Sequence, residues 1–140
     1  MNTAAKVRCG VYAAIAVVAL AATWSQNLAY DASHLSQFLP DTAVTAASRS
    51  ITVDIVLLFL AAAVLMVLEA RRHRVRFVWA YIAGGLLIAI SVTFPLFLIA
   101  RERRLAAEGV ETPRLGGLDI ALLAVLTVAS VATTVWVGTR

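Results

Sequence analysis

Long apolar blocks constrain this chain more than any other feature. They lie at about residues 9–24, 51–70, 77–100 and 118–138, and short polar segments separate them. An α-helix rises about 1.5 Å per residue, so about twenty residues cross a hydrocarbon core of about 30 Å. The apolar residues also lack the 3.6-residue alternation of a soluble amphipathic helix. The sequence therefore predicts four transmembrane helices.

The composition agrees with this prediction. The 140 residues are 61% hydrophobic and 14% charged, which is less charge than a soluble domain carries. We expect an all-α fold, an up-and-down bundle of four transmembrane helices that forms one integral membrane domain over residues 1–140. Its expected location is the cell inner (plasma) membrane, with the lipid bilayer as its first partner.

The first block also fits another interpretation. Lys6 and Arg8 precede an alanine-rich core, and the small residues around Ala19 resemble the cleavage site of a secretory signal. The block continues to Trp24, however, and tryptophan is typical of membrane interfaces. We expect a retained helix, and cleavage stays open.

The excess of basic over acidic residues indicates contact with the membrane surface. The formal net charge is +4, but the cations lie in short loops beside apolar blocks. In such loops they orient a membrane protein and meet anionic head groups, so we expect no nucleic-acid partner. With the N-terminus inside, seven cations are cytoplasmic and five external, which favours both termini in the cytoplasm. The inner set is Lys6, Arg8, Arg71, Arg72, Arg74, Arg76 and Arg140, and the outer set is Arg49, Arg101, Arg103, Arg104 and Arg114.

The second block carries two carboxylates. Glu69 ends it, and Arg72 lies nearby, so we expect Glu69 to pair with a guanidinium in the head-group region. Asp54 lies about one turn inside the other end. It either begins the helix, where the helix dipole stabilises an anion, or it is a half-buried acceptor that needs a cation. The face that holds Asp54, Leu58, Leu65 and Glu69 is expected to look into the bundle.

A predicted polar layer surrounds Asp54. In an up-and-down bundle, the end of the third helix and the starts of the second and fourth lie on one side. We expect Asp54 and Asp119 to accept hydrogen bonds there from Arg49 and Arg101. This cluster either binds a ligand or holds the helices together. The candidate ligand-binding residues are Asn27, Arg49, Asp54, Arg101, Arg103 and Asp119, with Glu69 and Arg72 as secondary candidates, and Asp31 lies at the same level.

Other chemical signals are weak. His34 and His73 are far apart and lack ligand spacing, so we expect no metal site and no cofactor. The carboxylates of Asp54 and Glu69 are about 22 Å apart on a continuous helix, too far to act as one catalytic pair. Gly84 and Gly85 predict close helix packing.

Several segments together carry a resemblance. "TWSQN", "SRSITVD", "EARR" and "FPLFLIARER" resemble a family of small bacterial four-helix integral membrane proteins catalogued only as a domain of unknown function. The similarity covers about residues 23–104. It implies no activity, substrate or cofactor, and it makes these the positions to test: Asn27, Arg49, Asp54, Glu69, Arg101 and Arg103.

Four functions compete. The first is a non-enzymatic accessory or structural membrane protein, which pairs with another membrane protein or with a second copy. The second is a lipid- or small-molecule-binding protein that uses the polar cluster at the outer mouth of the bundle. The third is a proton-coupled transporter acting as a dimer, and the fourth is an isomerase or cyclase with Asp54 as general acid. Short loops and the lack of a catalytic motif favour the first.

Overall fold

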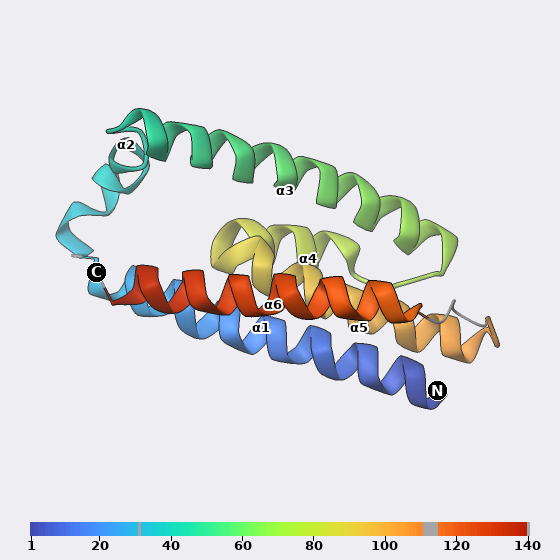
Figure 1. Cartoon of the computed structure of the whole chain (residues 1–140). Coiled ribbons are helices and arrows are strands. Elements are labelled where there is room, and N and C mark those ends of the chain that lie inside the picture. Colours follow the sequence, from blue (N-terminus) through green and yellow to red (C-terminus); the bar gives the residue numbers. More distant parts are fainter. Residues whose placement is uncertain (31, 111–114, 140) are drawn as a thin grey trace.

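The computed structural model describes residues 1–30, 32–110 and 115–139. All regular structure in these residues is helical. Four stretches are long and apolar enough to cross a membrane: α1 (Thr3–Ala29), α3 (Ala46–Arg72), the stretch Val78–Ala107, and α6 (Gly117–Gly138). The predicted all-α class with four apolar helices is therefore confirmed (Figure 1).

Polar caps extend the helices beyond the apolar blocks. The Asn2 side chain accepts a hydrogen bond from the Ala5 amide at 2.9 Å, so α1 begins well before the predicted block. Thr45 and Ser48 form a reciprocal capping box at the start of α3. The long loop between these helices holds two short helices, η1 (Ala32–Gln37) and α2 (Phe38–Asp41).

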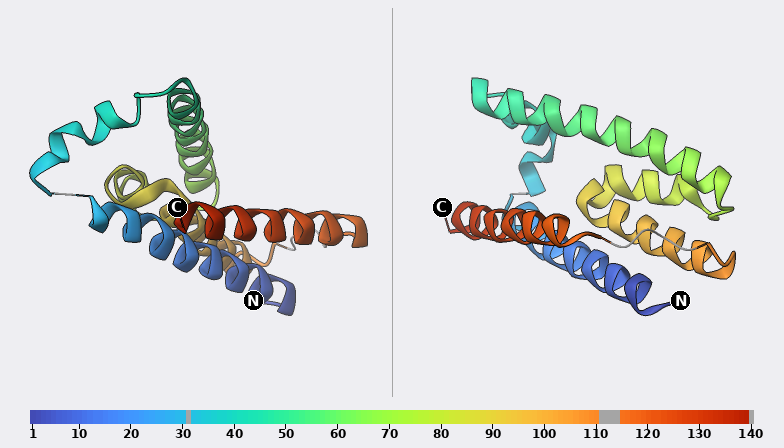
Figure 2. Two further views of the ribbon diagram at one scale, coloured as in Figure 1. Left: turned by 60° about the vertical axis from the view of Figure 1, so that its left-hand side comes forward. Right: turned by 45° about the vertical axis from the view of Figure 1, so that its right-hand side comes forward.

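The third stretch doubles back on itself. It consists of α4 (Val78–Gly84), a π-helical segment η2 (Gly85–Ala89) and α5 (Ile90–Ala107), and Ala89 has extended backbone. The rings of Tyr81 and Phe97 are 5.8 Å apart between centroids, whereas one straight helix would separate these residues by about 24 Å. Figures 1 and 2 show a helical hairpin whose two ends lie at the same end of the molecule. The predicted up-and-down order is therefore wrong at this stretch.

Close contacts hold the turn of this hairpin. A Cβ on Gly85 would lie 2.9 Å from Cε2 of Phe59 and 3.1 Å from Oγ1 of Thr93, so glycine allows the approach. This confirms the close packing predicted for the glycine pair. Pro95 lies farther along α5 and removes the backbone hydrogen bond to the Ser91 carbonyl, which weakens the helix just after the turn.

The core lies between α3 and the hairpin. Met66 and Phe97 are its fully buried side chains, and buried residues from α3, the following turn and α4 surround them. On α3 the inward side chains are Ala62, Met66 and Ala70. The predicted inward face is wrong because Asp54, Leu58 and Leu65 are exposed, and of the predicted face Glu69 alone is half-buried. The hairpin reaches only the second half of α3 and contacts the Met66 side.

The outer helices pack unevenly. α1 runs along α5, whereas none of the described residues of α6 is buried. The N-terminus lies at one end of the molecule, and the last described residues lie at the other (Figure 1). The predicted cytoplasmic location of both termini stays a prediction. Because the hairpin returns to the end from which it started, α6 finishes at the opposite end from the N-terminus.

We predict that Gly85→Leu destabilises the hairpin, because the new side chain must occupy the space of Phe59 and Thr93. Such overpacking costs about 1–3 kcal/mol. Thermal unfolding in detergent measures the loss, and Gly10→Leu is the matched control because a Cβ there meets nothing within 4 Å. Adding Phe59→Ala should restore part of the loss. Equal stability of the Gly85 and Gly10 variants would contradict the packed turn.

Candidate functional site

Charged side chains form a continuous chain across one end of the bundle. Nη2 of Arg8, on α1, donates to Oε2 of Glu102, on α5, at 2.8 Å. The other oxygen of Glu102 lies 3.8 Å from Nη1 of Arg101. Nε of Arg101 in turn donates directly to Oε2 of Glu69, at the end of α3. These contacts tie α1, α5 and α3 together.

A histidine extends the chain beyond Glu69. Nε2 of His73 lies 3.7 Å from Oε2 of Glu69, and its Nδ1 lies 3.1 Å from Oε2 of Glu108. His73 is buried directly after α3, and Glu108 directly follows α5. We call this set the ion-pair chain: Arg8, Glu69, His73, Arg101, Glu102 and Glu108.

Glu102 is the most enclosed acid of the ion-pair chain, with 4% of the residue exposed. A carboxylate out of water is stable only with a cation or hydrogen-bond donors beside it, and Arg8 supplies both. Removal of either partner would cost this charge-assisted contact in a buried setting. The ion pairs at this end of the bundle therefore attach the helices to one another.

The structure divides the predicted polar cluster. Arg101 contacts Glu69, fifteen residues along α3 from Asp54, which is about 22 Å on a continuous helix. The predicted pairing of Arg101 with Asp54 is wrong because the chain reverses at Ala89. Arg103, two residues after Arg101 on α5, and Arg72, at the end of α3, are exposed at this same end.

The other predicted residues have local partners or lie on the surface. Nη1 of Arg49 donates to the carbonyls of Ala43 and Val44, in the segment before α3. Asp119 accepts from the Gly116 amide at 3.0 Å and caps α6. Asn27 is exposed near the end of α1. Asp31, Arg114 and Arg140 lie outside the described residues. The ligand-binding role of the predicted set stays a prediction.

The sequence reasoning missed Arg8, Glu102 and Glu108. Charge counting assigns Arg8 only a role in orientation and assigns no role to Glu102 or Glu108. One signal was present: the "RERR" segment puts an acid among three arginines, which fits an acid with a specific partner. The partner could not be assigned because the reversal at Ala89 has no strong sequence signal.

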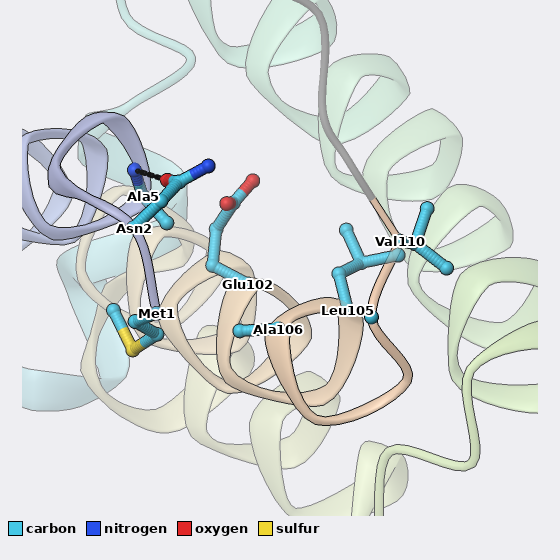
Figure 3. Close-up of a pocket in the computed structure, with 8 residues that line it drawn as sticks. Met1, Asn2, Ala5, Glu102, Leu105, Ala106 and Val110 are labelled. Carbon is cyan, nitrogen blue, oxygen red and sulfur yellow. Dashed lines mark hydrogen bonds between the residues drawn. The ribbon is translucent and has the colours of Figure 1, made fainter.

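Hollows lie at both ends of the bundle. A cavity of about 170 Å³ lies between the start of α1 and the end of α5, and Asn2, Glu102 and Leu105 contribute to its lining (Figure 3). Ligand sites usually enclose about 300–1,000 Å³, and Arg8 already occupies the Glu102 carboxylate. A groove of about 760 Å³ lies at the other end between α1 and α6, and its lining includes Asn27 and Thr133.

Polar chemistry elsewhere is sparse in the described part of the chain. Within it, no three His, Cys, Asp or Glu side chains lie close enough to hold a metal ion. At the end of α1, the Tyr30 hydroxyl donates to the Asp41 carboxylate, and this hydrogen bond raises the pKa of the phenol. That contact joins α1 to α2.

We predict that Glu102→Gln destabilises the bundle by about 3 kcal/mol, because it removes the negative charge that Nη2 of Arg8 contacts at 2.8 Å. Thermal unfolding in detergent is the measurement. The double variant Arg8→Met/Glu102→Leu should recover most of the loss, since both charges are then absent. Arg103→Gln, at the exposed neighbouring position, is the control and should be neutral. A neutral Glu102→Gln would contradict the assigned contact.

We predict opposite outcomes for the two acids of α3. Asp54→Asn should change stability by no more than about 0.5 kcal/mol, because Asp54 is exposed. Glu69→Gln should cost about 1.5–3 kcal/mol, because it weakens charged hydrogen bonding to Arg101. Unfolding of the two variants under identical conditions compares them directly. A larger loss for Asp54→Asn would favour the pairing first predicted from the sequence.

Comparison with known proteins identifies a family. The family model described as "Protein of unknown function DUF2834" matches residues 11–103, which is 93 of the 140 residues. The matched region runs from α1 through the hairpin to Glu102 and Arg103, and α6 lies beyond it. No curated protein and no solved structure matches the chain. The predicted family resemblance is confirmed, and the chain belongs to the DUF2834 family of proteins of unknown function.

Proposed function

We propose that this protein is a non-enzymatic accessory subunit of a plasma-membrane assembly, built as a single integral membrane domain. In this proposal a second membrane-embedded chain covers the turn of the α4–α5 hairpin. The partner is either a different membrane protein or a second copy of this chain. The observation that carries the proposal is the depth at which the hairpin ends.

The hairpin turn lies halfway along the neighbouring helix. Gly85 approaches the ring of Phe59, and Phe59 is the central residue of α3. If α3 spans the bilayer, the turn lies near the middle of the hydrocarbon core. The reversal at Ala89 interrupts the helical backbone at that depth.

Lipid cannot satisfy such a turn. The amides that begin a helix have no partners within it, and α5 has no side-chain cap at its N-terminus. Each unsatisfied backbone group in hydrocarbon costs several kcal/mol, so irregular backbone at membrane depth is covered by protein or faces a water-filled cavity. Leu86 and Leu87 at the turn are 72% and 80% exposed, which leaves an apolar surface for a partner helix.

The charged residues support an assembly role. Within the ion-pair chain, Glu102 is held by Arg8, and Glu69 is held by Arg101. These contacts already use the charges that a ligand or a transported ion would need. They also fix the ends of α1, α3 and α5 together, so that the hairpin is presented in one orientation.

The distribution of cations supports one orientation in the membrane. Arg49 lies at the end of the molecule opposite the ion-pair chain, and most described cations lie at the ion-pair end. By the positive-inside rule that end faces the cytoplasm. The N-terminus is then cytoplasmic, and the end of α6 faces the other side. The cations at the ion-pair end are Lys6, Arg8, Arg71, Arg72, Arg74, Arg76, Arg101, Arg103 and Arg104.

Purification from native membranes in mild detergent tests the assembly role. We predict a co-purifying membrane protein, or a dimer of this chain, in stoichiometric amount by mass spectrometry. A photo-crosslinking side chain at Leu87 should join that partner, because Leu87 is exposed at the hairpin turn. The matched control is the same side chain at Leu68, which is also exposed but lies on α3 near the ion-pair end. Crosslinks from both positions alike, or from neither, would contradict a partner at the turn.

A second function is favoured by the groove between α1 and α6. Its volume of about 760 Å³ is in the range of small-molecule sites, and its lining combines apolar side chains with Asn27, Thr133 and Thr134. This surface suits a lipid or another amphipathic molecule. A bound lipid in stoichiometric amount, with no protein partner, would favour lipid handling over the accessory role.

A further inference from the structure

The turn after α3 presents a row of arginines in a fixed conformation. His73 and Val75 are buried. Arg74, which lies between them, and Arg76, which follows Val75, are exposed. His73 is held by Glu108, and the Val75 amide donates to the Ala70 carbonyl at 3.0 Å. Side chains therefore alternate between the core and the surface.

The backbone of this turn is also constrained. Arg74 has φ 53° and Phe77 has φ 61°, so both occupy the left-handed region that non-glycine residues rarely adopt. The buried Val75 packs in the same core as Met66 and holds the segment between them. The turn is thus a specified surface feature and not a loose loop.

Its positive charge has no internal counterpart among the described residues. Arg71 and Arg72, in the last turn of α3, are exposed like Arg74 and Arg76. None of the four forms an ion pair within the described residues. The nearby acids Glu69 and Glu108 instead contact Arg101 and His73. Four exposed cations therefore lie within six residues of sequence.

Aromatic side chains accompany these cations. Phe77 and Trp79 are 77% and 64% exposed, and the Arg76 guanidinium lies 5.9 Å from the centre of the Phe77 ring. Aromatic side chains at the end of a membrane helix typically lie at the depth of the lipid head groups. The turn therefore combines phosphate-binding groups with side chains suited to the membrane interface.

We infer that this surface binds the phosphate groups of anionic phospholipids in the leaflet that meets this end of the protein. We call it the basic turn: Arg71, Arg72, Arg74, Arg76, Phe77 and Trp79. A guanidinium donates two parallel hydrogen bonds to phosphate oxygens, and the aromatic rings lie among the glycerol and upper acyl groups. This binding needs neither the proposed partner nor the α1–α6 groove, which lies at the other end of the bundle.

Native mass spectrometry of the detergent-purified full chain tests the inference. Phosphatidylglycerol is titrated, and the fraction of protein with bound lipid is measured. Arg74→Gln/Arg76→Gln should weaken phosphatidylglycerol binding by about tenfold or more, because two cations are lost from the surface. The matched control is Arg103→Gln/Arg104→Gln, which removes the same charge from exposed positions on α5. It should change binding by no more than about twofold.

Other probes separate the remaining explanations. Phosphatidylcholine should bind much more weakly, and inorganic phosphate at millimolar concentration should not displace the lipid. Equal loss in both double variants would overturn the inference in favour of diffuse charge attraction. Displacement by inorganic phosphate would overturn it in favour of a soluble-anion site. If the Arg74/Arg76 variant does not fold, Arg71→Gln/Arg72→Gln replaces it and must show the same selective loss.

Discussion

The hydrogen bond from Arg101 to Glu69 is the contact on which the arrangement of the chain depends. Glu69 lies at the end of α3, so Arg101 must return to the end where α4 begins. The reversal at Ala89 makes that possible, and the ring contact between Tyr81 and Phe97 follows from it. Arg8 then joins α1 to the same end through Glu102. One electrostatic layer thereby holds three helices in register.

This arrangement has consequences for the membrane. A stretch long enough to cross the bilayer instead begins and ends at one end of the molecule, so the positive residues after the hairpin lie with those before it. The numbers of Lys and Arg at the two ends of the molecule therefore differ much more than they would in an up-and-down bundle of four transmembrane helices. The hairpin turn contacts Phe59 at the middle of α3 and leaves exposed leucines there. The ion-pair chain fixes one end of the bundle, and the hairpin turn exposes an apolar surface. Together these features suit a subunit that packs against another chain.

Much of the fold was predictable from the sequence. Block length and apolar composition predicted four membrane-length helices, and the glycine pair predicted close packing at Gly85. The pairing of Glu69 with an arginine was also expected, but the partner was not, because periodicity does not distinguish one thirty-residue helix from two that fold together. Ala89 is a good helix former, and its extended backbone arises from tertiary contacts. The predicted pairing of Asp54 with Arg101 is wrong for this reason, since it assumes that the third stretch runs from one end of the bundle to the other.

Cysteine accessibility tests the half-crossing hairpin most directly. In a Cys9→Ser background, single cysteines replace Arg76, Arg103 and Thr42, all in segments outside the packed core. A membrane-impermeant maleimide is added to intact and permeabilised cells. The hairpin predicts that positions 76 and 103 label on one side and position 42 on the other. Labelling of position 103 together with position 42 would show that the third stretch crosses the membrane, and would contradict the arrangement of Arg101 beside Glu69.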